Sequence, residues 1–255
     1  MSRRVARPTL LVLGLLLTTG CAGLGLEHPA TAPRPTPTVE SSAPVPTAGT
    51  GDGTDGLSAA QAQAALITVS DLGAPWAATR GAATWRDGLL KSTAAGECQR
   101  LLDVLYTDEL LGGPARATVG LDDADTGAQL RFQVGAQRPA EVDRALEWLG
   151  TMPQKCAWFT ATTAGGAMQD VRVYGAALPE VGDVRQGLRV TLESEVEDGE
   201  SVTLTLDVAA VRVGEDAFAL SNGGLGDVPN EATQAAVQLG ALRLADVRQQ
   251  GRAEV

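Results

Sequence analysis

The clearest pattern in the chain is an alternation of apolar and polar residues in its second half. Apolar side chains occupy every second position from Leu188 to Leu192, and again from Val202 to Val208. A period of two residues predicts half-buried β-strands. Between the two runs stands Asp198-Gly199, a dipeptide that favours a type I′ turn. The pattern therefore predicts an antiparallel hairpin.

Further strands are predicted by shorter runs. Residues 115–121 and 128–134 flank the turn sequence DDADTG, and Leu130, Phe132 and Val134 fall on one face of the second run. Other candidate strands are the ranges 76–85, 171–176 and 215–222.

Four segments have helical patterns. Ser58 is a candidate cap for a helix over 57–66. The ranges 98–106 and 138–149 carry apolar stripes at helical spacing, and Gly150 suits the position just after a helix end. Residues 230–248 form the last predicted helix. Together these elements predict an α+β fold: one domain with an antiparallel sheet of four to seven strands and helices packed on one face.

The first twenty residues have the layout of a secretory signal peptide. Three arginines precede an apolar run from Leu10 to Leu17, which is too short to span a bilayer. Small residues follow and end at Gly20-Cys21. This ending resembles a bacterial lipobox, although Thr18 stands where leucine is usual. We therefore predict that Cys21 becomes the first residue and carries diacylglycerol and palmitate; the alternative is an ordinary secreted protein with an unmodified cysteine.

The segment after Cys21 is rich in proline and threonine and has almost no aliphatic surface to bury, so a disordered tether is predicted. The predicted organisation is a lipoprotein signal peptide (1–20), a lipidated cysteine and tether (21–56), an α+β domain (57–250) and a tail (251–255). The domain would then lie at the outer face of the cytoplasmic membrane, held there by its lipid.

Charge excludes one class of partner. Residues 1–20 contain three arginines and no acidic residue, so their removal changes the formal net charge from −11 to −14. An acidic domain is a poor ligand for phosphate backbones, and we predict no nucleic-acid partner. The predicted partners are the membrane, through the lipid, and an unknown small ligand or envelope protein.

Two cysteines remain for the domain, Cys98 and Cys156. Export places them where disulfides form and persist, which predicts a Cys98–Cys156 bond. The alternative is a pair of separate buried thiols.

Most catalytic machinery is excluded. The only histidine, His28, lies in the predicted tether, which removes Ser-His-Asp and Cys-His catalysis and histidine-bound zinc from the domain. No phosphate loop, dinucleotide fingerprint or G-x-S-x-G turn is present. We predict no catalytic residue, no metal and no cofactor.

Carboxylates are the remaining chemical groups. Asp122, Asp123 and Asp125 resemble the start of a calcium loop that lacks its closing glutamate, and a solvated turn is the favoured interpretation. A second cluster comprises Glu193, Glu195, Glu197, Asp198 and Glu200. Its alternate residues share one strand face, which is typical of a solvated outer face. A glycosidase would need two carboxylates facing each other across a cleft.

Three tryptophans are candidates for the wall of a ligand cleft: Trp76, Trp85 and Trp148. Aromatic residues line most ligand pockets, but each of these could equally belong to the core or its rim.

The order of features resembles a known family. A Pro/Thr-rich tether is followed by a helix, "ITVSDLGA", a cysteine helix, a hairpin and "AEVDRALEWL" with a later cysteine. This is similar to the extracellular sensor domain of mycobacterial serine/threonine kinases of the PknH type, and to stand-alone actinobacterial lipoproteins. The resemblance implies helices packed over an antiparallel sheet and a cleft for an unidentified ligand. It also implies a second disulfide, but the chain has no cysteine after Cys156.

The favoured function is a lipid-anchored, sensor-like binding module without catalytic activity. The alternatives are an extracytoplasmic hydrolase that works through carboxylates and a scaffold for an envelope protein.

Overall fold

The computed structural model describes residues 56–195 and 200–253. The predicted signal peptide, Cys21, the tether with His28 and the Asp198-Gly199 turn therefore lie outside the described residues. The elements are, in chain order, α1 (Ala59–Ala64), α2 (Val69–Leu72), β1 (Trp76–Ala78), the π-helical turn η1 (Arg86–Leu90), β2 (Ser92–Thr93), α3 (Gly96–Thr107), β3 (Ala115–Asp123), β4 (Gln129–Gly135), α4 (Pro139–Lys155), β5 (Trp158–Thr163), β6 (Met168–Gly175), β7 (Val184–Glu195), β8 (Ser201–Val213), β9 (Asp216–Leu225) and α5 (Asn230–Ala253).

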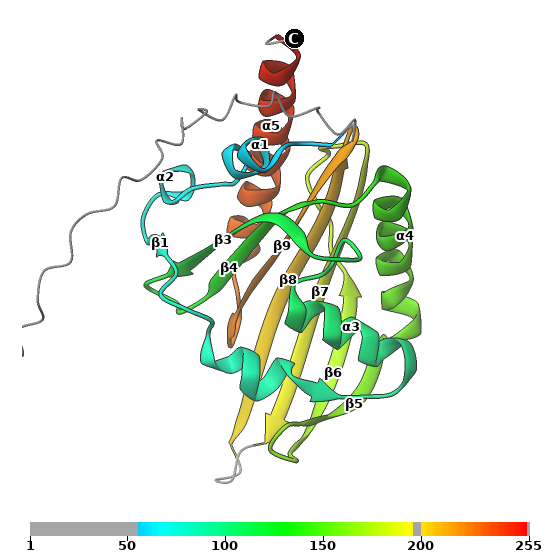
Figure 1. Ribbon diagram of the computed structural model, residues 1–255. Helices are drawn as coiled ribbons and strands as arrows, with labels where there is room; N and C mark the ends of the chain where they lie inside the picture. The colour runs from blue at the N-terminus through cyan, green and yellow to red at the C-terminus, as the bar shows by residue number, and fades with distance from the viewer. Residues whose placement is uncertain (1–55, 196–199, 254–255) are drawn as a thin grey trace, which may run out of the picture. The chain divides into compact units, whose positions relative to one another are not determined.

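The described strands form one nine-stranded sheet in the order β1-β3-β4-β9-β8-β7-β6-β5-β2 (Figure 1). Every neighbouring pair is antiparallel. The predicted hairpins are present as β3–β4 and β7–β8, and Leu130, Phe132 and Val134 are buried in one cluster. The expected number of strands was too low, because β2 and β5 were not predicted.

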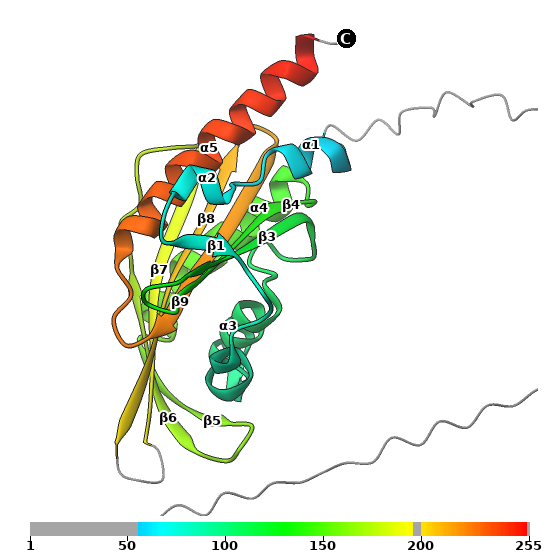
Figure 2. The ribbon, with the colours of Figure 1, turned by 90° about the vertical axis from the view of Figure 1, so that its left-hand side faces the viewer.

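The α+β fold with an antiparallel sheet is confirmed, but helices pack on both faces of the sheet rather than on one. The first core lies between one face and α3, α4 and η1, and it includes Leu204, Leu206 and Val208 of β8. The second core lies between the opposite face and α1 and α5, and it includes Ala209 and Val211 of the same strand. Figure 2 shows α3 and α5 on opposite sides of the sheet.

Both faces are covered because the two central strands are apolar on both faces. Residues 208–211 of β8 read VAAV and residues 217–220 of β9 read AFAL, and all eight are buried. A continuous apolar run is typical of a strand with a layer on each side. The alternation at 188–192 and 202–208 reports only the parts of the sheet where one face is polar.

Two helices extend beyond their predicted ends. The sequence placed the end of α4 at Gly150, but the helix continues to Lys155. Met152 lies in this extension and is fully buried in the first core, which explains the extra turn. The other is α5, which continues past Arg248 to Ala253 and so includes part of the predicted tail.

The predicted disulfide is present. It joins Cys98 in the first turn of α3 to Cys156, the residue that caps the C-terminal end of α4, across 58 residues of sequence. Cys156 is almost fully buried. The bond therefore fastens the two helices that cover the first core.

No helix within the described ranges combines the length and the hydropathy needed to cross a membrane.

Candidate functional site

The three candidate tryptophans lie in three different places. Trp76 begins β1 and packs against the second core. Trp148 lies on α4 at the edge of the first core, where Arg100 stacks over its ring at 4.2 Å and its indole N–H donates to Glu97 at 2.6 Å. Only Trp85 lines one of the pockets found in the described part of the chain. The three side chains do not form one cleft.

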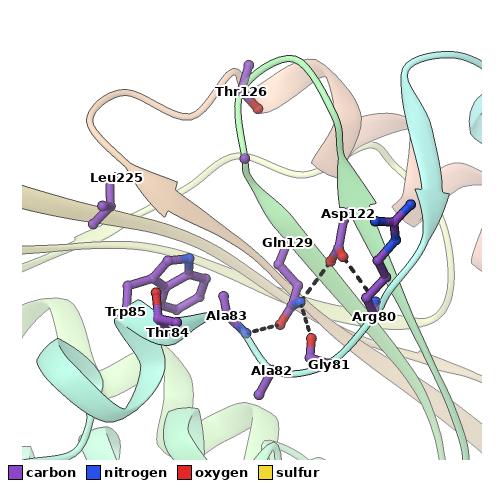
Figure 3. A pocket seen from close by; sticks show the side chains of 11 residues that line it. Arg80, Gly81, Ala82, Ala83, Thr84, Trp85, Asp122, Thr126, Gln129 and Leu225 are labelled. Carbon is purple, nitrogen blue, oxygen red and sulfur yellow. Dashed lines mark hydrogen bonds between the residues drawn. The ribbon is translucent and has the colours of Figure 1, made fainter. Parts of the chain in front are cut away.

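The Trp85 pocket is a hollow of about 530 Å³ between the segment 80–85 and the ends of three strands (Figure 3). One wall is the segment itself. The other wall comes from β3, the β3–β4 turn, β4 and the end of β9. The residues that line the pocket are Arg80, Gly81, Ala82, Ala83, Thr84, Trp85, Asp122, Thr126, Gly127, Gln129 and Leu225.

The pocket exists because the chain leaves the sheet early. A strand over 76–85 was predicted, but pairing ends at Ala78. Gln129 then holds the departing segment. Its side-chain amide donates to the carbonyl oxygen of Gly81 at 2.9 Å and accepts from the backbone N–H of Ala83 at 3.3 Å. Because Gln129 is 3% exposed and its contacts are fully formed, the wall is built before any ligand binds.

Trp85 closes the inner end of the pocket. The side chain is 7% exposed, and its ring lies so close to Gly223 of β9 that a Cβ atom there would come within 2.9 Å of it. The indole N–H is buried and has no hydrogen-bond partner in the part of the chain that the structure describes. An unpaired buried donor costs about 1–3 kcal/mol, so a well-packed protein seldom keeps one without a use.

The pocket contains one carboxylate, that of Asp122. Partial burial raises the pKa of Asp122, but hydrogen bonds from Gln129, Thr79 and the backbone of Arg80 outweigh burial and lower it. The carboxylate therefore stays ionised, and both oxygens already accept hydrogen bonds, Oδ1 from Gln129 and Oδ2 from the N–H of Arg80. It cannot act as a general acid at neutral pH. The site as built can hold a ligand, and it has no second carboxylate for hydrolysis.

The described residues of the two acidic motifs do not form a metal site. At the β3–β4 turn the Asp123 carboxylate accepts from the backbone N–H groups of Asp125 and Thr126, which is the geometry of a self-capped turn. Glu193 and Glu195 lie on the exposed face of β7, and residues 197–198 of the second motif are outside the described residues. Among the residues that are described, no group of three acidic, histidine or cysteine side chains could hold a metal ion.

A buried polar cluster that the sequence did not reveal lies under the first turn of α5. Asp207 of β8 is 2% exposed and stands opposite Asn222 of β9. Thr233 of α5 donates to Asp207 Oδ2 at 3.3 Å, and Arg189 lies 3.6 Å from Oδ1. Burial raises the pKa of Asp207 more than Arg189 and Thr233 lower it. Asp207 Oδ1 and Asn222 Oδ1 are both buried acceptors without a hydrogen bond.

This cluster predicts a pH dependence of stability. Because the pKa of Asp207 is higher in the folded than in the unfolded chain, ionisation of Asp207 costs stability as the pH rises above the ordinary aspartate value. We expect the free energy of unfolding of Asp207→Asn to increase relative to that of the native chain between about pH 4 and about pH 7, because only the native chain has this carboxyl group to ionise. Urea unfolding at both pH values measures this difference. The exposed Asp246→Asn variant controls for the loss of one negative charge, and a flat difference for Asp207→Asn would contradict the prediction.

Comparison with known proteins gives little beyond this geometry. No protein-family model and no curated protein matches the chain. Among solved structures the chain is similar to the crystal structure of the extracellular domain of PknH from Mycobacterium tuberculosis, with 15% sequence identity and a TM-score of 0.46. That match covers 76% of this chain and 97% of the other.

Proposed function

We propose that this chain is a lipid-anchored, extracytoplasmic binding module whose Trp85 pocket takes a small uncharged ligand. The observation that carries the proposal is Trp85, which lines a preformed pocket and whose buried indole N–H has no partner among the described residues. A small shift of the ring toward the pocket would let a ligand oxygen accept from this N–H and remove the cost of the unpaired donor.

The rest of the pocket indicates the kind of ligand. Ala82, Ala83 and the half-exposed Leu225 supply apolar contact, while Arg80 on one wall and Asp122 on the other offer one charge of each sign. A ligand with a strong net charge would gain little from such a balanced pair. A compact, neutral molecule with an apolar body and one or two oxygen acceptors fits this lining best.

Binding is favoured over hydrolysis by the same lining. The one carboxylate in the pocket is held ionised and is fully hydrogen bonded. The cysteines of the domain are joined in a disulfide, and the only histidine in the sequence is His28. The module therefore lacks a nucleophile–base pair at the site, and sensing or delivery of a ligand is the function that this arrangement supports.

A thermal-shift titration tests the pocket. Neutral lipid fractions of the cell envelope should raise the Tm of the native domain, because a ligand at about 100 times its Kd stabilises the folded state by about 2.7 kcal/mol. We expect Trp85→Phe, which keeps an aromatic ring but removes the N–H, to lose most of this shift. Trp148→Phe is the matched control, since Trp148 lies outside the pocket.

Two results would contradict this part of the proposal. An equal rise in Tm for the native chain and for Trp85→Phe would place the ligand elsewhere. Turnover of a fraction that disappears in Asp122→Asn would make the pocket an active site.

The lipid anchor has a separate test. We expect the Cys21→Ser variant to leave the membrane fraction, because the variant has no thiol to receive the lipid while the acidic domain gains little from an anionic bilayer surface. Cell fractionation with detection of the processed chain measures this. Normal processing and unchanged membrane retention of Cys21→Ser would exclude lipidation at this residue.

A further inference from the structure

On the face of the sheet that carries α5, the part formed by β5 and β6 has no helix over it. Residues 158, 160 and 162 of β5 and residues 168, 170, 172 and 174 of β6 alternate with buried residues and are all exposed. They point away from the first core, so they lie on the same face as α5, which contacts β8 and β9 instead. In Figure 2, α5 covers the upper part of this side, and β5 and β6 lie below it without a helix. We refer to this surface as the open face.

The open face displays two aromatic side chains around an arginine. Trp158 is 63% exposed and Tyr174 is 49% exposed. Trp158 stands directly opposite Arg172 in the sheet, and Tyr174 follows Arg172 on the same face two residues later. Trp158 and Tyr174 are therefore diagonal neighbours, about 7–8 Å apart at the backbone. Although Trp158 follows the disulfide-bonded Cys156 by two residues, its side chain faces solvent.

These groups are available to a ligand. No side-chain hydrogen bond, ion pair or ring contact joins Trp158, Arg172 or Tyr174 to any other residue in the described ranges. A single exposed apolar residue needs no explanation, but a contiguous patch rimmed by polar residues marks an interaction site, and Trp158 with Tyr174 around Arg172 forms such a patch.

A polar hollow adjoins the aromatic pair. It has a volume of about 480 Å³ and is lined by Thr160, Ala167, Met168, Gln169, Asp170, Glu193, Glu195 and Ser201. Thr160 and Asp170 are two residues from Trp158 and Arg172, respectively, on the same face, so the hollow begins next to these two side chains. Asp170 stands opposite Glu193 of β7, which brings hydrogen-bond acceptors to the floor of the hollow.

We propose that the open face binds a neutral glycan. The exposed ring faces of Trp158 and Tyr174 suit the apolar C–H faces of sugar rings. Arg172 can donate to ring and hydroxyl oxygens, and the carboxylates of Asp170 and Glu193 can accept from sugar hydroxyl groups. Ring stacking beside bidentate polar contacts is the chemistry that a polyhydroxylated, uncharged polymer requires.

Other classes of occupant fit less well. The central parts of protein interfaces are depleted in aspartate and glutamate, whereas the hollow holds Asp170, Glu193 and Glu195. The same carboxylates would repel an anionic polymer, and the mature charge of −14 adds to that repulsion. The proposal is independent of the Trp85 pocket, which belongs to the opposite face of the sheet and to the first core.

A printed array of neutral and anionic glycans, probed with the folded domain, tests the proposal. We expect binding to a set of neutral glycans, and a loss of about tenfold or more in apparent affinity in Trp158→Ala, as for removal of a central aromatic anchor. Tyr174→Ala and Arg172→Ala should also weaken binding. Leu242→Ala is the matched control, because Leu242 is 62% exposed but lies on α5. Unchanged Tm and circular dichroism establish that each variant is folded.

Each alternative outcome has a distinct meaning. Absence of binding to every neutral glycan, binding to anionic glycans alone, or binding that survives Trp158→Ala would overturn the proposal. Self-association that disappears in Trp158→Ala, measured by analytical ultracentrifugation, would assign the open face to a second copy of the chain. Trp85→Phe should retain full glycan binding, so failure of the Trp85 pocket and failure of the open face can be told apart.

Discussion

Arg86→Met is expected to lower the free energy of unfolding by about 3 kcal/mol, which is the lower end of the range for breaking a buried ion pair. The Arg86 side chain is only 5% exposed and lies 3.0 Å from the Asp108 carboxylate. Its guanidinium also donates to the carbonyl oxygens of Leu105 and Tyr106. Methionine keeps much of the volume but leaves one carboxylate and two carbonyl groups with fewer donors.

The position of Arg86 explains the size of this effect. Asp108 ends α3 in the left-handed region, with φ of 61°, and the last carbonyl groups of the helix need donors there. Arg86 supplies them from the turn that follows the Trp85 pocket, so one side chain joins the end of α3 to the pocket wall. Arg131 still pairs with Asp108 at 2.6 Å in the variant, which is why the lower end of the range applies.

Urea denaturation monitored by circular dichroism measures the change. Arg138→Met is the control, because Arg138 also forms an ion pair, with Glu141, but its side chain is 82% exposed and the pair is screened by solvent. Equal stabilities for the two variants would show that the Arg86 ion pair contributes no more than a surface pair.

Replacing Cys98 and Cys156 together by alanine is expected to cost about 2–5 kcal/mol, and the chain-entropy model gives about 4 kcal/mol for a loop of this size. The bond closes 58 residues, a span that includes the β3–β4 hairpin and all of α4. Without it the unfolded chain gains conformational freedom, and α3 and α4 are held together only by noncovalent contacts, such as the hydrogen bond from Trp148 to Glu97.

The measurement is a pair of denaturation curves, for the native chain and for the double variant. Addition of a reductant supplies the internal control, because it should lower the stability of the native chain to that of the variant and leave the variant unchanged. Peptide mapping of protein recovered from cells without reductant should find one linked peptide. Two alkylatable thiols in that material would contradict the prediction.

The sequence predicts elements well where one face of an element is apolar and the other polar. The alternation through β7 and β8 and the stripe on α4 are of this kind, and they led to the confirmed fold class. Prediction from the sequence fails where the two faces of an element no longer differ in polarity. Residues 208–211 and 217–220 are apolar throughout, so the pattern does not reveal that a second layer, made by α1 and α5, covers the other face. β5 was not predicted for a different reason. Its outward positions carry a tryptophan beside threonines, so its outward face does not read as polar.

The candidate site depends on how the strands are aligned in the sheet more than on the pattern of apolar and polar residues in the sequence. Trp85 was a candidate from its residue type alone, and it lines a pocket. Gln129 was not a candidate, because its role follows from the pairing of β3 with β4. This pairing brings the Gln129 amide next to residues 81–83. No local signal distinguishes such a glutamine from any other polar residue in a strand. The same holds for the Asp207–Asn222 pair, which only the alignment of β8 with β9 brings together.

The order of strands in the sheet determines when during synthesis the sheet can close. The β3–β4 hairpin comes early in the chain, but its neighbour in the sheet is β9, so Leu130 meets Asn222 only after almost all of the domain has emerged. An isolated hairpin is marginally stable, and contacts between segments so distant in sequence form slowly. Until β9 and α5 have been synthesised, the apolar face of β4 lacks most of the second core. The N-terminal third of the domain therefore stays incompletely folded, and accessible to chaperones and proteases, until the last strand and helix have been synthesised.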